Sequence, residues 1–511
     1  MADGQADSSR TSAPGRTAPE PVVLAVDIGS SGVRCLAHTE DHRVLAVSAR
    51  DLATTSRPDG QSTHSWAAVL DATTECLREL AVLASIEVAA ISLSGTASSL
   101  AVARASPGGG SQDVGDVLLW SDSRASAFAE DPASAGAVAR FGRTLCPAHP
   151  SYWPAKVRWA LAAEAPGRRA SLRLAGAKDF VFEVLTGQWW VDPMTAAATG
   201  VFDSRAWGWD TEFLAEVGLE PDQLPEVHEG TDSAPATPAV VAALGLPART
   251  PVVLGGMDGP LAQLGAAGFR TDAHTCTVGT SLAYRAGVAS RREDPARRVW
   301  CYPVSRDFWV LGGAGSNGGN VLTWLAATLG RGSDVGGVVE EALGLAPEAG
   351  LLFLPYLHGE RAPLWRDDLR AAVIGLAAHH TAADIARAAL DGVGAAAIEL
   401  AGAVTAVAGA AQEVRLTGGF LKRGEWAQLV TDALGVPTCV PDPEAATATG
   451  AAVLGWMALG RPRPRPPGPG PAQATQRREP DAAVHAVLRS KAEAVRQVRA
   501  VLAPERGPGT S

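Results

Sequence analysis

Val22-Val-Leu-Ala-Val26-Asp27-Ile-Gly29-Ser-Ser-Gly32-Val33 is the stretch that decides the fold. Val22–Val26 is a short, continuously apolar run typical of a buried strand, and a second strand is predicted over Val33–His38. The turn between them consists of small residues. Glycine lets a backbone approach a ligand closely, and free N–H groups beside small hydroxyls donate to phosphate oxygens. This turn, followed by Arg34, therefore predicts a phosphate-binding hairpin.

The same pattern occurs again in the second half of the chain. A strand over Thr275–Val278 leads into the turn Gly279-Thr280-Ser281 and then into a strand over Leu282–Ala286. A single Gly-Ser turn is also explained by a hairpin that binds nothing. Two such hairpins, one in each half, predict an internally duplicated fold whose turns clamp one polyphosphate between them.

The length and the alternation of patterns indicate two α/β domains. The 511 residues fit two units of roughly 200 residues each. Strand-like runs such as Val88–Leu93 and Val117–Leu119 alternate with helical patterns such as Trp66–Ala84. Prolines at 235, 238, 247 and 251 favour a domain boundary there. We expect a disordered lead over 1–20, domains over 21–248 and 249–460, and a Pro/Arg-rich linker with a terminal helix over 461–511.

Charge and cysteine usage exclude several classes of protein. The net charge of −10 argues against binding nucleic acid or an anionic membrane. The six cysteines form no C-x-x-C pair, which favours reduced thiols and a cytoplasmic location. The first twenty residues contain no apolar signal core. The long apolar stretch Gly392–Ala411 carries Glu399, so a buried helix is predicted there rather than a membrane span.

One motif favours a different enzyme class. Gly313-Ala-Gly315-Ser-Asn-Gly318 fits the G-x-G-x-x-G pattern of dinucleotide-binding folds, and Asp334 follows at the distance of a ribose-binding acid. In such folds the acid ends a second strand, whereas Asp334 lies between two helical segments. The motif therefore leaves an NAD-dependent dehydrogenase as a weaker alternative. A P-loop is excluded because no G-x-x-x-x-G-K-[ST] sequence exists.

A carboxylate at a strand end is the candidate for chemistry. Gly255-Gly-Met-Asp258-Gly259 follows the apolar strand Val252–Leu254. An aspartate flanked by glycine at this position is reachable by a ligand in a cleft. The alternative is that Asp258 only caps the helix that begins near Leu261.

Together, these motifs resemble the FGGY family of carbohydrate kinases, which has the actin–hexokinase (ribonuclease H-like) fold. The resemblance covers roughly residues 22–460. It extends to Phe353–Trp365 with Gly375-Leu376, and to Leu416–Gly419 followed by Trp426 and Asp432. It implies an α/β protein with two duplicated domains around a cleft, the first binding the sugar and the second the nucleotide.

The resemblance also implies ATP and Mg²⁺ as cofactors and gives the motifs roles. Asp258 would be the general base that takes the proton from the sugar hydroxyl, and Asp27 would lie near the metal. One base suffices, because phosphoryl transfer depends mainly on alignment and charge neutralisation. The positions expected around the nucleotide are Gly29, Ser30, Ser31, Arg34, Gly279, Thr280, Gly319, Gly418, Gly419 and Arg423.

The acceptor side is expected in the first domain. Trp120 and Asp122 lie in a segment that resembles the family's sugar site, although Trp120 is also explained as a structural residue. Tyr152 begins a segment that resembles the gluconate kinase branch more than the xylulose branch, and Lys156 either lies on a helix surface or orients the acceptor. Ala97 and Ser98 stand where many members have Met-His, which predicts a roomier pocket that lacks a titratable donor.

The sequence therefore predicts ATP-dependent phosphorylation of a hydroxyl of a small sugar, sugar acid or polyol, with gluconate first and xylulose second. A sugar-sensing member without kinase activity is an alternative, which Asp27, Asp258 and the two turns oppose. The expected partner is a small-molecule sugar or sugar acid, with no nucleic acid and no membrane. A homodimer is left open.

Overall fold

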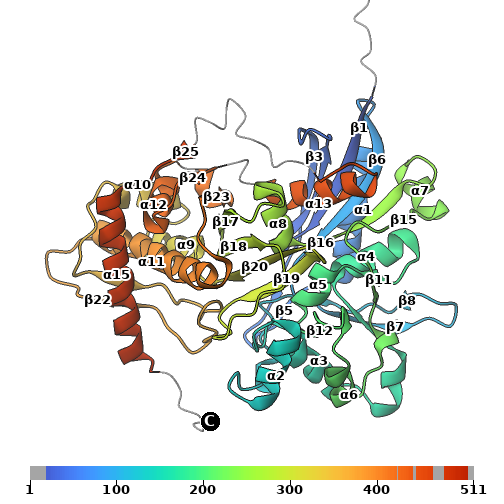
Figure 1. Ribbon diagram of the computed structural model, residues 1–511, viewed down its shortest axis with the longest axis horizontal. Helices are drawn as coiled ribbons and strands as arrows, with labels where there is room; N and C mark the ends of the chain where they lie inside the picture. Colours follow the sequence, from blue (N-terminus) through green and yellow to red (C-terminus); the bar gives the residue numbers. More distant parts are fainter. Residues whose placement is uncertain (1–18, 423, 441–444, 464–476, 505–511) are drawn as a thin grey trace, which may run out of the picture.

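Two domains, each built around one sheet, lie side by side in the computed structural model (Figure 1). The structure describes residues 19–422, 424–440, 445–463 and 477–504. Most of the lead predicted over 1–20 and most of the Pro/Arg-rich linker therefore lie outside the described residues. The described chain begins almost directly with the first strand, β1 (Glu20–Ile28).

The first sheet has the strand order β15-β16-β6-β1-β2-β3. Strand β1 is antiparallel to β2 and parallel to β6, which is parallel to β16. The apolar run Val22–Val26 is completely buried, because helices cover both faces of the strand that carries it. The other strands of this sheet are β2 (Gly32–His38), β3 (Val44–Asp51), β6 (Ile86–Gly95), β15 (Ser233–Pro235) and β16 (Pro251–Met257).

The second sheet repeats this arrangement, with the order β19-β20-β18-β17-β23-β24-β25. Its central strand β17 (Ala273–Val278) is antiparallel to β18 and parallel to β23, and β23 is parallel to β24. The duplicated α/β fold predicted from the two hairpins is confirmed. The remaining strands of this sheet are β18 (Leu282–Val288), β19 (Trp300–Ser305), β20 (Phe308–Ala314), β23 (Glu413–Thr417), β24 (Thr438–Cys439) and β25 (Arg477–Arg478).

The first sheet continues past residue 248, where the sequence placed the domain boundary. Strand β16 pairs with both β15 and β6, so the segment that leads into Asp258 belongs to the first sheet. The chain then passes to the second domain through α8 (Asp258–Ala267). The prolines near 248 mark the connection into an additional strand and do not mark the end of the domain.

Helices α8 and α13 (Ala446–Ala458) cross each other between the two domains (Figure 1). A Cβ atom on Gly265 would overlap the carbonyl of Ala446, and one on Gly450 would overlap the carbonyl of Leu261. Helix α13 lies between β24 and β25 of the second sheet in sequence but packs on the first sheet, where Ser92 Oγ donates to the carbonyl of Ala451 at 2.7 Å. The two glycines therefore permit the backbone contact that joins the domains.

Helix α11 (Ala382–Ala408) is the core helix of the second domain. Among the described residues it alone is long and apolar enough to cross a membrane, and more than half of its most apolar stretch is buried. It packs against β18 and β21 and against the terminal helix α15 (Ala482–Leu502). The buried helix predicted over 392–411 and the predicted terminal helix are confirmed.

The other helices cover the sheets or form insertions around them. They are α1 (Trp66–Ala81), α2 (Ala135–Thr144), α3 (Trp153–Ala162), α4 (Ala177–Thr186), α5 (Pro193–Ala198), α6 (Thr211–Val217), α7 (Pro238–Leu244), α9 (Gly319–Thr328), α10 (Val335–Leu343) and α12 (Gly424–Leu434). The small strands are β4 (Thr55–Ser56), β5 (Ser62–His64), β7 (Ala101–Ala105), β8 (Ser111–Gln112), β9 (Val117–Leu118), β10 (Leu172–Ala175), β11 (Trp190–Val191), β12 (Phe202–Asp203), β13 (Gly208–Trp209), β14 (Glu226–Val227), β21 (Leu352–Leu354) and β22 (Ala372–Ile374).

Candidate active site

Asp258 is the first residue of α8 and directly follows β16. The end of β16 is irregular at Gly255, which has φ 65° and lies so close to Leu93 that a Cβ would overlap its carbonyl oxygen. Only glycine fits this close approach. The Asp258 carboxylate accepts the N–H of Gly259 at 2.7 Å, whereas the helix cap itself is Met257. The carboxylate is therefore held at the strand end and does not cap the helix.

The surroundings of Asp258 suit proton transfer. Burial raises the pKa of its carboxyl to about 6, against the attraction of Arg285 and with repulsion from Asp27 adding to the rise. The N–H groups of Gly259 and Ala97 act in the opposite direction. A carboxylate with this pKa is ionised at neutral pH and still accepts a proton more readily than an ordinary aspartate.

Asp27 is the penultimate residue of β1 and lies on the same edge of the first sheet. Ser94 Oγ donates to its carboxylate at 3.0 Å, and burial raises its pKa against the influence of Ser94 and Arg34. Asp27 and Asp258 repel each other electrostatically. A divalent cation would relieve this repulsion, and carboxylate oxygens are the ligands that Mg²⁺ prefers. The residues present therefore fit the predicted metal near Asp27.

In each predicted phosphate turn, the N–H of the glycine closes the hairpin by donating to a carbonyl further along the turn. Gly29 N–H donates to the carbonyl of Gly32 at 2.9 Å, and Gly279 N–H donates to that of Ser281 at 3.0 Å. Ser30, Ser31 and Thr280 are exposed at the tips of the turns, and Arg34 is exposed just beyond the first. These side chains are available to a ligand.

Three predicted glycines gather around the second turn. The N–H groups of Gly319 and Asn320 donate to the carbonyls of Gly279 and Thr280 at 2.9 and 3.0 Å, so the start of α9 is attached to the turn. Gly319 itself is buried, with the Phe420 ring where a side chain would be. Gly418 has φ 107° and touches the carbonyl of Val278.

Gly419 follows Gly418 and is exposed. The predicted Arg423 lies outside the described residues. Gly279, Thr280, Gly319 and Gly418 form one cluster. They lie together because the parallel strands β17 and β23 both end at this edge of the second sheet.

The segment around Ala97 and Ser98 is fixed by the backbone. Ser98 has φ 54°, in the left-handed region, and its hydroxyl donates to the carbonyl of Ala198 at 2.6 Å. The hydroxyl is therefore committed to the protein, whereas the N–H of Ala97 faces Asp258. Of these two predicted acceptor-side positions, Ala97 is the one whose backbone faces Asp258.

Lys156 is completely buried and joins two segments of the predicted sugar site. Its ammonium donates to the carbonyls of Ser98 at 2.9 Å and Leu119 at 2.8 Å. Burial lowers its pKa to about 7, with Asp122 attracting the charge. The helix-surface alternative is thus excluded, and the lysine holds the two segments in place.

Asp122 and Trp120 have different surroundings. The Asp122 carboxylate is 1% exposed: its Oδ2 accepts the N–H of Ser62 at 3.0 Å and Nη2 of Arg124 at 2.6 Å, and its Oδ1 accepts Nε of Arg124 at 3.0 Å. Both of its oxygens are therefore committed, so its carboxylate shapes the segment. Trp120 is only half-buried, and the Arg361 guanidinium lies 4.0 Å from the centre of its ring. Tyr152 is buried, with its hydroxyl 3.4 Å from that of Tyr302.

Two arginines of this site received no role from the sequence. Arg285, on β18, faces Asp258 and donates to Thr277 Oγ1 at 2.9 Å. A charged residue inside the otherwise apolar strand Leu282–Val288 was the signal that could have revealed it. Arg361 belongs to the signature segment, and its charge interacts with Asp258 and Tyr152.

The G-x-G-x-x-G segment packs against Glu360, which directly precedes Arg361. Glu360 accepts the N–H groups of Ser316 and, at 3.0 Å, of Arg361, and Asn317 Nδ2 donates to it at 3.1 Å. Burial raises its pKa to about 7. Asp334 accepts the N–H of Gly337 at 2.9 Å and caps α10. Asp334 is therefore a helix cap and does not end a strand, where a ribose-binding acid would lie, so the dehydrogenase alternative is not supported.

A separate group of potential metal ligands consists of Glu348, His379 and His380. His380 Nδ1 accepts the N–H of Ala377 at 2.9 Å, and its Nε2 lies 3.0 Å from Glu348. A neutral imidazole bound to a metal carries its proton on the other ring nitrogen, where Ala377 N–H already donates. These hydrogen bonds favour a structural group over a metal site.

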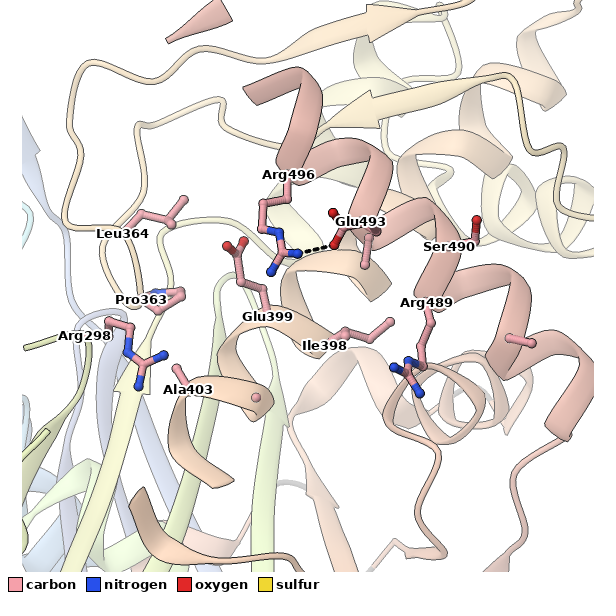
Figure 2. Close-up of a pocket in the computed structure, with 13 residues that line it drawn as sticks. Arg298, Pro363, Leu364, Ile398, Glu399, Ala403, Arg489, Ser490, Glu493 and Arg496 are labelled. Atoms are coloured by element: carbon pink, nitrogen blue, oxygen red, sulfur yellow. Dashed lines mark hydrogen bonds and ion pairs between the residues drawn. The ribbon is translucent and has the colours of Figure 1, made fainter. Parts of the chain in front are cut away.

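A cavity of about 750 Å³ lies between α11 and α15 (Figure 2). Figure 2 shows Arg489 and Arg496 on α15 and Glu399 on α11 around it, with Pro363 and Leu364 at one side. None of the predicted site residues lines the cavity. It borders the loop that carries Arg361, and Trp365 Nε1 of this loop donates to the carbonyl of Arg298 at 2.8 Å.

Known proteins match nearly the whole described chain. Residues 22–265 match the N-terminal domain and residues 275–459 the C-terminal domain of the "FGGY family of carbohydrate kinases". The gluconokinase of Bacillus subtilis (strain 168) is 30% identical over 365 residues, which cover 67% of this chain and 70% of that protein.

Two solved structures have the same fold. The gluconate kinase from Lactobacillus acidophilus superposes with a TM-score of 0.86 at 25% identity, covering 96% of this chain and 100% of that one. The ligand-bound xylulose kinase from the same organism gives the same TM-score, identity and coverage. The family, the fold and the enzyme class predicted from the sequence are confirmed.

Proposed function

Because the chain belongs to the FGGY family of carbohydrate kinases and is thus an ATP-dependent sugar kinase, we propose that it transfers the γ-phosphoryl group of MgATP to a hydroxyl of gluconate. The observation that carries the proposal is Asp258, a partly buried carboxylate directly after β16 whose pKa is about 6. The gluconokinase of Bacillus subtilis and the gluconate kinase of Lactobacillus acidophilus support the choice of acceptor.

Asp258 takes the proton of the attacking hydroxyl. The N–H groups of Gly259 and Ala97 orient its carboxylate, and Arg285 stabilises the ionised form before the proton arrives. Phosphoryl transfer has a loose transition state, so the base acts late and alignment supplies most of the acceleration. The proton ends on the Asp258 carboxylate.

The two hairpin turns hold the nucleotide phosphates. Ser30, Ser31 and Thr280 present hydroxyls there, and Gly29 and Gly279 let the backbone approach. Gly418 and Gly419 border the adenosine. A bound Mg²⁺ would neutralise the phosphate oxygens, and Asp27 is the residue that would hold it. The phosphates therefore lie between the two domains, with the adenosine against the second domain and the acceptor against the first.

Burial of the cysteines supports a cytoplasmic location. All six thiols are free and buried, and burial raises the pKa of the thiols of Cys146, Cys276 and Cys301 to about 12. Such thiols are protonated and unreactive. A fold without disulfides is suited to a reducing compartment, where the sugar acid and ATP are also available.

Xylulose is the second candidate, because a xylulose kinase superposes as well as a gluconate kinase does. The test is ADP release measured with gluconate, xylulose, ribulose, glycerol and erythritol. We expect gluconate to exceed the others by at least about 10² in kcat/KM, because a site that hydrogen-bonds its substrate rejects one lacking a partner. A higher kcat/KM for xylulose would replace the first candidate by the second. No acceptor above the ATP hydrolysis background would contradict both.

A further inference from the structure

Strand β16 contains a β-bulge shortly before Asp258. Its pairing with β6 shifts by one residue, so that Leu254 and Gly255 lie opposite Leu93 alone. One extra residue reverses the faces on which the following side chains lie, and bulges beside active sites re-aim a side chain in this way. The bulge therefore sets the direction in which the chain presents the Asp258 carboxylate.

Three polar backbone groups of the bulge have partners outside β6. The N–H groups of Leu254 and Gly255 donate to the loop before β15, to the carbonyls of Asp232 at 3.0 Å and Gly230 at 2.9 Å. The Leu254 carbonyl accepts Nζ of Lys178, a residue of α4, at 3.4 Å. Buried backbone groups need partners, so the bulge is held by a loop on one side and by a lysine on the other.

The stem of Lys178 packs against the end of β6. The side chain is 1% exposed, and a Cβ atom on Gly95 would overlap the Cβ of the lysine. Gly95 is the β6 residue opposite Met257, which directly precedes Asp258. The lysine therefore touches both strands at the position from which the chain continues into the general base.

Two buried carboxylates fix the ammonium group of Lys178. Its Nζ lies 2.9 Å from Oδ1 of Asp179 and 2.9 Å from Oδ2 of Asp192. Burial alone would lower the pKa of the lysine, but the two carboxylates raise it above its usual value, so the ammonium stays charged. Asp192 also caps α5 and lies against Gly256, where a Cβ would be 3.4 Å from its Oδ1. The cluster thus joins α4, α5 and the end of β16.

A buried ion cluster contributes little net stability, because the cost of desolvation offsets much of the attraction. A connected buried polar network instead fixes the geometry of the groups around it. Geometry matters most beside the reacting atoms, where a misplacement of about 1 Å can lower the rate about 10²-fold. The location of this cluster, behind the bulge that leads to Asp258, favours a role in alignment.

We propose that Lys178 is a positioning residue: it holds the bulge at Leu254 and Gly255 in the geometry that directs Asp258 at the acceptor hydroxyl. This inference rests on the proposed role of Asp258 as the general base and adds the residue that aligns it. Lys178 itself touches neither the acceptor nor the nucleotide, so it acts on the rate of transfer and not on binding.

The first test replaces Lys178 by methionine, which keeps most of the length of the side chain and removes its charge. We expect Lys178→Met to lower kcat by about 10², with the KM values for ATP and for the acceptor within about threefold of the wild type. Thermal unfolding shows whether the variant is folded. If it is not, Lys178→Met combined with Asp192→Asn takes its place, because this pair leaves one buried carboxylate fewer without a cation.

The second test combines the lysine variant with Asp258→Asn in a double-mutant cycle. In the Asp258→Asn background, Lys178→Met should lower kcat by less than about threefold more, because a base that is absent cannot be misaligned. A lysine that only stabilises the fold would give the same loss in both backgrounds. The acceptor is gluconate, or xylulose if the wild type prefers it.

Lys491→Met is the matched control. Lys491 is also a buried lysine, and its Nζ lies 2.7 Å from Asp391, but it joins α15 to α11. Its loss should change kcat by less than about twofold in the folded protein.

Three results would overturn the inference. They are a folded Lys178 variant with kcat within about threefold of the wild type, a loss confined to a KM value, and an equal loss with and without the Asp258 carboxylate. The proposed base fails separately: Asp258→Asn alone would then keep more than about a tenth of the wild-type kcat.

Discussion

The two sheets have the same topology but carry different side chains at the same positions. At the end of the first sheet, Asp27 of β1 pairs with Ser94 of β6 in the strand register, and the serine hydroxyl donates to the carboxylate at 3.0 Å. At the corresponding place in the second sheet, Thr277 of β17 pairs with Thr417 of β23, and their hydroxyls are 2.8 Å apart.

The difference shows how two sheets of the same topology can have different chemical roles. Both sheets place small polar groups at the ends of parallel strands beside a glycine turn. The first sheet adds two carboxylates there, Asp27 and Asp258, which suit a cation and a proton. The second offers hydroxyls and glycines without a carboxylate in the Thr277–Thr417 pair, which avoids repelling a polyanion. The backbone thus provides the same frame twice, and the side chains decide which half performs the chemistry.

Removing the carboxylate from the first half should have the largest effect. We expect Asp258→Asn to lower kcat by about 10² or more, the usual scale for a general base. The matched control is Asp272→Asn, because Asp272 precedes β17 at the opposite end of the strand and pairs with Arg270. It should change kcat by less than about twofold. Steady-state assays with gluconate measure kcat for both variants. If Asp258→Asn keeps more than about a tenth of the wild-type kcat, Asp258 is not the general base.

Breaking the connection between the halves should unfold them together. Gly450→Val places a side chain against the carbonyl of Leu261, where α13 crosses α8. We expect a loss of more than about 3 kcal/mol of stability, because backbone cannot move aside as a flexible side chain can. Gly402→Ala is the control on α11, where a Cβ meets nothing within 4 Å, and it should stabilise the protein by about 0.5–1 kcal/mol.

Denaturant unfolding of these two glycine variants measures both effects. Equal stabilities would show that the crossing at Gly450 does not join the domains.

The pH dependence should report the carboxylate of the first half. The pKa of Asp258 in the folded protein is about 6, so kcat/KM should fall about tenfold from pH 7 to pH 5 as the base becomes protonated. In Asp258→Asn, the residual kcat/KM should no longer fall between pH 7 and pH 5. A flat profile for the wild type between pH 5 and 7 would contradict the assignment.

The raised pKa of Asp258 affects stability in the opposite direction to activity: ionisation of the carboxyl activates the base but destabilises the fold. A carboxyl whose pKa is raised on folding stabilises the protein fully below its unfolded pKa, near 4, and loses this contribution as the pH rises through 6. Asp258→Asn should therefore be more stable than the wild type at pH 7, by on the order of 1–3 kcal/mol, and about equally stable at pH 4. Thermal unfolding at the two pH values checks this, and a less stable variant at pH 7 would contradict it.

Local patterns predicted the frame and the ends of its strands. The apolar run before Asp27 and the glycine turns determined both hairpins, because strand burial and turn geometry depend on neighbouring residues. The strand before Asp258 was also predicted. Its membership of the first sheet was not, because pairing with β6 joins residues more than 150 positions apart in sequence.

Side-chain roles that depend on distant partners were harder to predict. Asp122 was expected in the sugar site, but Arg124 and the backbone of Ser62 occupy its oxygens. Ser98 looked like part of an open pocket, but its hydroxyl bonds to Ala198, one hundred residues away. Arg361 lies in the segment Phe353–Trp365 that resembles the family. Its contact with Trp120 of the other domain could not be predicted from the sequence. Residue type predicted the chemistry, and long-range packing decided which groups are free to perform it.

The most direct test of the division between the halves is a calorimetric titration of Asp258→Asn with MgADP. We predict a Kd within about twofold of the wild-type value, because the nucleotide is assigned to the two hairpin turns and to Gly418 and Gly419, whereas the lost carboxylate is assigned to the proton of the acceptor. A Kd raised by more than about tenfold would contradict this assignment, since the carboxylate would then hold the nucleotide as well as remove the proton.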